Sequence, residues 1–129
     1  MEGFYIEDLI DSGFPGGTVY VDRHLVILRT RKPDGLRFAG EIDIANSDAV
    51  GASLALAFPE FGDPHLDVSR LSFCDISGIR AIIEAAGALA PGRRLLLHGL
   101  PDQLETVMKV TGWSDLPSFE LCHCSEEKA

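Results

Sequence analysis

The stretch Phe73-Cys74-Asp75-Ile76-Ser77-Gly78-Ile79-Arg80 joins an apolar, β-forming segment to the clearest helical pattern in the chain. We expect a buried strand to end at Phe73 and a helix to begin at Ile76. A helix N-terminus leaves several backbone N–H groups without intrahelical partners and concentrates partial positive charge. Asp75 can accept from one of these groups as an N-cap, and a phosphate on Ser77 would be partly stabilised there. The stretch therefore predicts a helix cap, a regulatory site, or both together.

The helix that follows is marked by apolar residues at three- and four-residue steps. We expect these residues to face the core: Ile76, Ile79, Ile83, Ala86 and Ala90. The dipeptide Pro91-Gly92 then ends the helix, because proline and glycine both disfavour its continuation. The pattern predicts a helix over residues 76–90.

Two β-rich runs lie upstream of this junction. Residues 18–30 contain many β-forming side chains and are broken into two short strands by Asp22-Arg23-His24. Lys32-Pro33-Asp34-Gly35 is a turn signature, since proline presets φ and glycine permits positive φ. Residues 36–42 then alternate apolar and other side chains with the period of a half-buried strand. The runs on either side of the turn predict a hairpin.

The other predicted elements complete an alternating pattern. Between the hairpin and the junction we expect a helix over 46–57, a loop over 58–64 and a strand over 66–73. After the helix at 76–90 we expect a strand over 94–98, a helix over 101–112 and a strand over 119–121. The residues expected to face the core are Val50, Leu54 and Ala57 in the first of these helices and Leu104, Val107 and Met108 in the last. Strands that alternate with helices in this way predict an α/β layer protein with parallel, right-handed crossovers.

Composition excludes several classes of function. The 129 residues and 14.0 kDa are enough for one domain with its own core. The net charge of −9, from 20 acidic and 11 basic residues, argues against non-specific nucleic-acid binding and against an anionic membrane surface. No apolar run approaches the roughly 20 residues of a membrane span, and the segment 1–8 is acidic where a secretory signal would be basic. Three cysteines form no even disulfide framework, so we expect a cytoplasmic protein.

Other chemistries lack the residues that they need. Cys122-His123-Cys124 has no second pair of ligands at a suitable spacing, so we expect no metal. Ser77 lacks the Gly-x-Ser-x-Gly motif of hydrolases, and no motif places His98 as its base. Glu41 and Asp43 are either a solvated acidic pair or part of a partner surface. No glycine-rich loop precedes a helix, and we therefore expect neither an enzyme nor a cofactor.

Four motifs, in this order, resemble those of the STAS domain family, the fold of bacterial anti-sigma factor antagonists. They are Gly40-Glu41-Ile42-Asp43, the run from Leu66 to Asp75, Ser77-Gly78-Ile79 and Thr111-Gly112-Trp113. The resemblance implies an α/β STAS fold, with a mixed, mostly parallel central sheet of four to six strands and three to four helices. It divides the chain into an N-terminal extension (1–17), a STAS domain (18–122) and a flexible acidic tail (123–129).

The same resemblance implies a regulatory function. Family members bind a kinase-type anti-sigma factor and so act in transcriptional regulation. The kinase phosphorylates a serine directly after the aspartate of the loop, which breaks the complex. This chain has Ile76 at that position, which leaves Ser77 as a displaced candidate phosphoacceptor. A phosphate there would add a charge of about −1.5 to −2 beside Asp75.

We expect one loop and one strand end to bind the partner. The expected partner-binding residues are Asp75, Ile76, Ser77, Gly78, Ile79, Arg80, Glu41 and Asp43. The alternative is a phosphorylation-independent STAS scaffold or a ligand-sensing module. A homodimer is compatible with either function.

Overall fold

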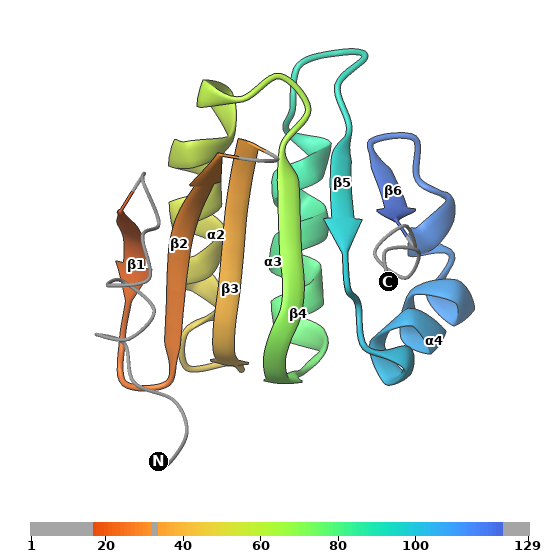
Figure 1. Cartoon of the computed structure of the whole chain (residues 1–129). Coiled ribbons are helices and arrows are strands. Elements are labelled where there is room, and N and C mark those ends of the chain that lie inside the picture. Colours follow the sequence, from red (N-terminus) through yellow and green to blue (C-terminus); the bar gives the residue numbers. More distant parts are fainter. Residues whose placement is uncertain (1–16, 32–33, 123–129) are drawn as a thin grey trace.

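The computed structural model describes residues 17–31 and 34–122, and it contains a six-stranded sheet (Figure 1). The strands, which lie in the sheet in chain order, are β1 (Thr18–Val21), β2 (Leu25–Arg31), β3 (Asp34–Ile42), β4 (His65–Cys74), β5 (Leu95–His98) and β6 (Phe119–Cys122). The α-helices of these residues are α2 (Ser47–Ala57), α3 (Ile76–Gly87) and α4 (Asp102–Thr111). Two short 3₁₀ helices, η1 (Phe58–Glu60) and η2 (Trp113–Asp115), follow α2 and α4.

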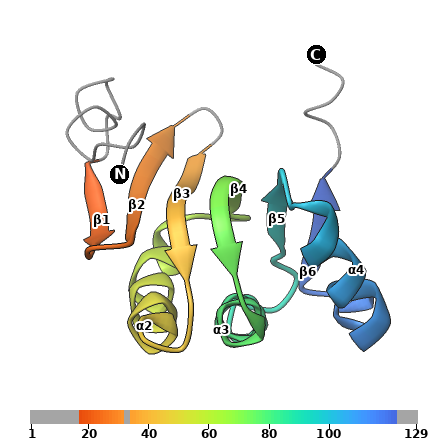
Figure 2. The same cartoon turned by 90° about the horizontal axis from the view of Figure 1, so that it is seen from below.

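The sheet is mixed, as the sequence predicts. Strands β1, β2 and β3 pair antiparallel, whereas the pairs β3–β4, β4–β5 and β5–β6 are parallel. The helices α2, α3 and α4 of the described residues lie on one face of the sheet (Figure 2). The α/β architecture expected from the four motifs, with a mixed central sheet and α-helices packed on it, is confirmed.

The core lies between the sheet and the helices. On β3 the predicted alternation places Leu36, Phe38 and Ile42 in the core, and α2 contributes Val50 and Leu54. Burial of such side chains contributes about 1.5–3 kcal/mol each. Because β3 and β4 are parallel, their carboxyl ends meet at one edge, and α2 and α3 begin there. This edge carries the junction at Asp75.

Helix α3 differs from its prediction in length and in orientation. It ends at Gly87 instead of residue 90. The N–H groups of Ala88 and Leu89 donate to the carbonyls of Ala85 and Ala86, three residues back, so the last turn is tighter than an α-helix. Its buried face consists of Gly78, Ile79, Ile82 and Ala86. Ile76 was predicted to be inside but is half-exposed, since the first turn of the helix lies at the end of the sheet.

Three other predictions need comment. The loop after α2 contains η1, and in α4 only Met108 is fully buried, with Leu104 and Val107 partly buried against the core. The predictions for residues 1–16, for Lys32 and Pro33 and for the tail 123–129 lie outside the described residues. In the described part of the chain, no helix is long and apolar enough to cross a membrane.

Candidate functional site

Asp75 caps helix α3, as its position in the sequence predicts. The residue is extended, with its N–H bonded to the carbonyl of Ile42 at 3.2 Å, which anchors the junction to β3. Its Oδ1 accepts from the backbone N–H groups of Ser77 at 3.0 Å and Gly78 at 3.2 Å. The hydroxyl of Ser77 donates to the same oxygen at 2.5 Å. One carboxylate oxygen therefore holds the whole first turn.

These contacts favour the ionised carboxylate of Asp75. The Ser77 hydroxyl, assisted by the N–H groups of Gly78, Ser77 and Ile44, holds the pKa of Asp75 below its ordinary value of 3.8. The contact with Ile44 also shows that the loop between β3 and α2 lies against this carboxylate. The two loops form one site.

Two of the expected partner-binding residues are part of the core. Gly78 and Ile79 are both buried, and a Cβ on Gly78 would lie 2.7 Å from the Cys74 sulfur and from Ile42 Cγ2. Burial also raises the pKa of the Cys74 thiol to about 12, so this thiol stays protonated. Gly78 therefore allows α3 to approach the sheet closely.

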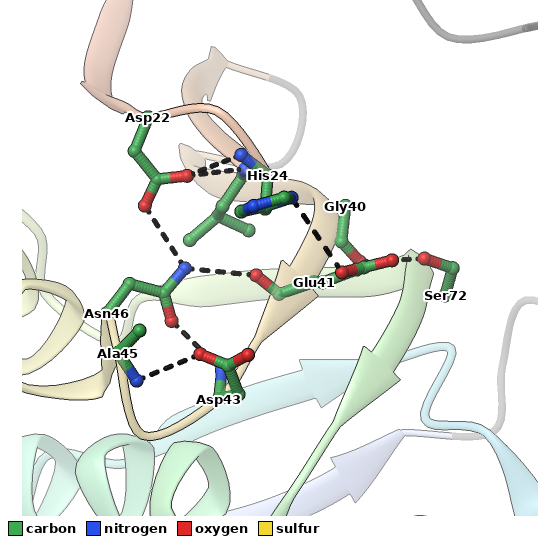
Figure 3. A network of polar contacts seen from close by, with 9 residues as sticks. Asp22, His24, Gly40, Glu41, Asp43, Ala45, Asn46 and Ser72 are labelled. Carbon is green, nitrogen blue, oxygen red and sulfur yellow. Dashed lines mark hydrogen bonds and ion pairs between the residues drawn. The ribbon is translucent and has the colours of Figure 1, made fainter. Parts of the chain in front are cut away.

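Glu41 and Asp43 flank Ile42, the last residue of β3 (Figure 3). Glu41 is exposed and pairs in register with Phe73 of β4, and its carboxylate is 4.0 Å from His24 Nδ1. The Asp43 carboxylate accepts from the N–H of Ala45 at 2.9 Å and so shapes the turn into α2. The structure thus brings both acidic residues to the edge that carries Asp75.

Asn46 connects three segments at this edge, which the sequence did not predict. It occupies the N-cap position of α2, but its side chain makes no capping hydrogen bond. Instead Oδ1 accepts from the N–H of Asp43 at 3.0 Å, and Nδ2 donates to Asp22 Oδ2 and to the carbonyl of Glu41, both at 3.1 Å (Figure 3). With 7% of its surface exposed, Asn46 is a buried positioning residue.

Asp22 extends this network into the turn between β1 and β2. Its carboxylate accepts from the N–H groups of His24 at 2.7 Å and Leu25 at 2.8 Å, and from the hydroxyl of Tyr20 at 2.5 Å. Burial opposes ionisation of Asp22, but the hydrogen bonds from Tyr20, His24, Asn46 and Leu25 hold its pKa below the ordinary value. In return, the carboxylate raises the pKa of Tyr20 to about 12.

Exposed apolar side chains stand among these carboxylates. Ile44, Phe73 and Ile76 are 79%, 50% and 49% exposed. We call them, together with the acidic residues Glu41, Asp43 and Asp75, the apolar–acidic surface. Exposed apolar side chains of this size at one end of the sheet are available for contact with another macromolecule. Ile44 and Phe73 were not predicted, because the sequence does not show that a strand end and a distant loop meet.

Ser77 and Arg80 complete the description of the expected site. Ser77 is partly buried, with its hydroxyl engaged by Asp75. Arg80 is exposed on the next turn of α3. The arrangement can hold a partner through apolar contact and charge.

The residues considered for other chemistries are not brought to this surface. His98 Nε2 lies 2.7 Å from Nδ1 of His65, and the two rings stack. Burial and the neighbouring His98 lower the pKa of His65. His98 pairs in register with Asp67, which lies near the start of β4, whereas Ser77 follows the other end of that strand. Within residues 17–31 and 34–122, no group of three or more His, Cys, Asp or Glu residues could hold a metal ion.

Comparison with known proteins shows similarity to a domain family and to solved structures. A family model described as "Mlab, STAS domain" matches residues 27–119, which run from β2 to the start of β6. A crystal structure of an anti-sigma factor antagonist from Mycobacterium paratuberculosis has a similar fold, with a TM-score of 0.56 and 15% sequence identity over 66% of this chain and 74% of that chain. No curated protein matches the sequence.

Proposed function

Since the chain belongs to the STAS domain family, we propose that it is a regulatory protein that binds a kinase-type anti-sigma factor through the apolar–acidic surface. Binding would release a sigma factor, in the manner of an anti-sigma factor antagonist. In this proposal the protein is not an enzyme and acts by association alone. The fold of the mycobacterial antagonist supports the proposal at the level of architecture.

The observation that carries the proposal is the exposure of Ile44, Phe73 and Ile76 around the capped start of α3. When a partner covers apolar side chains of this size, removing them from water stabilises the complex. The hydrogen bonds of Asp75 and Asn46 hold the loops in place before binding, which reduces the entropy lost on association.

Ile76 and Ser77 determine how such a complex would be regulated. Ile76 has no hydroxyl, so we propose that the surface binds without a phosphoserine switch at that position. A phosphate on Ser77 would replace the hydroxyl proton donated to Asp75 and place a charge of about −1.5 to −2 against that carboxylate. Phosphorylation of Ser77, where a kinase achieves it, would therefore weaken both the cap and the complex.

The binding experiment uses the full chain and the kinase-type anti-sigma factors of its source organism, with affinities measured by calorimetry. Ile76→Glu should weaken the complex by about thirtyfold or more, the effect of losing an interface hot spot of about 2 kcal/mol. Leu56→Glu is the matched control, because Leu56 is equally apolar, highly exposed and near the other end of α2. Absence of any complex, or an equal loss in both variants, would refute the proposal.

A second experiment separates the regulated module from the phosphorylation-independent scaffold. The purified chain is incubated with the anti-sigma kinase and ATP, and its intact mass is measured, with Ser77→Ala as the control. An unchanged mass supports the scaffold. A single added phosphate that disappears in Ser77→Ala identifies Ser77 as the acceptor.

A further inference from the structure

A hollow of about 310 Å³ lies at the ends of α2 and α3 that are remote from the apolar–acidic surface. One wall comes from the end of α2, η1 and the loop that follows, and the other from the end of α3 and the loop to β5. These segments lie together at the upper end of the molecule in Figure 1, whereas α3 begins at the lower end. The hollow is therefore separate from the proposed partner site.

The floor of the hollow is apolar and aromatic. The buried rings of Phe58 and Phe61 form part of it, and Leu89 contributes to the opposite wall. Ala85 and Ala88 also line it, and their short side chains leave space that larger residues would fill. A volume of about 310 Å³ is at the small end of the roughly 300–1,000 Å³ of ligand pockets. The space fits a small molecule with an apolar body.

Arg93 supplies a positive charge at the rim. Its guanidinium lies directly against Gly62, where a Cβ would come within 2.8 Å of Nη1. Among residues 17–31 and 34–122, no carboxylate lies within 4.0 Å of this guanidinium. A ligand can therefore bind this cation without first displacing an ion pair within the described part of the chain.

The charged neighbours of Arg93 are already engaged. Arg29 pairs with Glu60 and lies over the Phe61 ring, 4.8 Å from its centroid. Arg94 pairs with Glu120 at 2.8 Å, and the Asp63 carboxylate accepts from the Arg94 N–H at 3.0 Å. Two carbonyls near the end of α3 accept from Ala88 and Leu89, which limits the negative potential that this helix end presents.

We propose that the hollow binds a small carboxylate with an apolar body. The planar guanidinium of Arg93 holds a carboxylate through two parallel hydrogen bonds, a geometry that an ammonium group does not offer. The apolar body lies on Phe58 and Phe61, which excludes water from it. This site does not depend on the proposed partner or on any phosphorylation.

The experiment titrates octanoate into the full chain and follows the backbone amides by NMR. Octanoate should shift the amides of the non-proline residues within 58–62 and 85–93, whereas octylamine, of the same length and opposite charge, should not. Arg93→Gln should weaken octanoate binding about tenfold or more, since a charge-assisted pair is lost. Arg94→Gln is the matched control and should leave the affinity unchanged, because Arg94 pairs with Glu120.

A filling variant tests the space itself. Ala88 is exposed at the end of α3, so Ala88→Leu should fold normally and exclude octanoate from the hollow. Ile76→Glu should bind octanoate like the wild type, which separates this proposal from the partner proposal. Octylamine binding as tightly as octanoate, an unchanged affinity in Arg93→Gln, or no octanoate binding to the wild type would each overturn the inference.

Discussion

The stability of the start of α3 depends on pH through Asp75, because its ionised carboxylate accepts from two backbone N–H groups and one hydroxyl. At neutral pH, Asp75→Ala should lower the free energy of unfolding by about 1 kcal/mol, the usual effect of losing an N-cap. The pKa of Asp75 is lowered from 3.8 in the folded protein, so its contribution is present above pH 3.8 and is lost as the pH falls through the lowered pKa. Urea denaturation at several pH values measures this difference.

The control for this prediction is Asp75→Asn, which caps almost as well but cannot ionise. Its stability relative to Asp75→Ala should stay constant over the same pH range. If the difference between the wild type and Asp75→Ala stays unchanged well below pH 3.8, the charge of Asp75 does not contribute as described.

Asn46 carries a second prediction at this scale. Asn46→Ala removes the partners of the Asp43 N–H and the Glu41 carbonyl, and one partner of Asp22. A buried polar group left without a hydrogen-bond partner costs about 1–3 kcal/mol, so chemical denaturation should show a decrease of that size in the free energy of unfolding. His24→Ala should stay within about 0.5 kcal/mol of the wild type, because His24 is exposed. Equal effects in the two variants would mean that Asn46 does not hold the loops together.

These two residues also show what sequence can and cannot predict about a site. The cap at Asp75 could be predicted because its acceptor and donors lie within three residues of one another. The role of Asn46 could not be predicted, because its bond to Asp22 spans 24 residues and depends on how two loops meet. The exposure of Ile44 and Phe73 at the same edge as Asp75 was missed because it too depends on how a loop and a strand end meet.

At the scale of elements, the packing of α3 on the sheet depends on one glycine. Gly78→Ala would place a methyl group 2.7 Å from the Cys74 sulfur and from Ile42 Cγ2. These side chains or the helix must then shift, and we expect a net loss of about 1–3 kcal/mol in stability, typical of overpacking. Thermal and urea denaturation measure the change.

Gly87, at the other end of α3, is the matched control. A Cβ there meets no atom within 4 Å, so Gly87→Ala should gain about 0.5–1 kcal/mol from helix propensity alone. The two substitutions should therefore have opposite signs. A stabilising effect of Gly78→Ala would show that α3 does not lie this close to β3 and β4.

The order of the elements was predictable because turn residues and helix breakers separate them clearly. The pattern predicted all six strands of the described residues within a few positions. It was wrong about the inward direction of Ile76 and about the last turn of α3, since both depend on where the sheet ends beneath the helix. Periodicity defines a helical face but not the extent of the surface that covers it.

At the scale of the whole molecule, burial is uneven. Strand β3 is paired on both sides and carries Leu36, Phe38 and Ile42 into the core, whereas α4 buries only Met108 completely and leaves Val110 81% exposed. Segments with little buried apolar surface open at a lower free-energy cost than the core. The region around α4 should therefore open without unfolding of β2, β3 and β4.

Native-state hydrogen exchange followed by mass spectrometry tests this unequal stability. Amides of α4 should exchange well before those of β3 and β4, because local opening of the helix exposes them while the central strands require global unfolding. Met108→Ala should speed exchange in α4 strongly, since it removes the one fully buried side chain of the helix, and Val110→Ala should have little effect because Val110 contacts mainly solvent. Protection of α4 equal to that of β3 would mean instead that the domain opens as one cooperative unit, with the helix bound to it more firmly than its burial indicates.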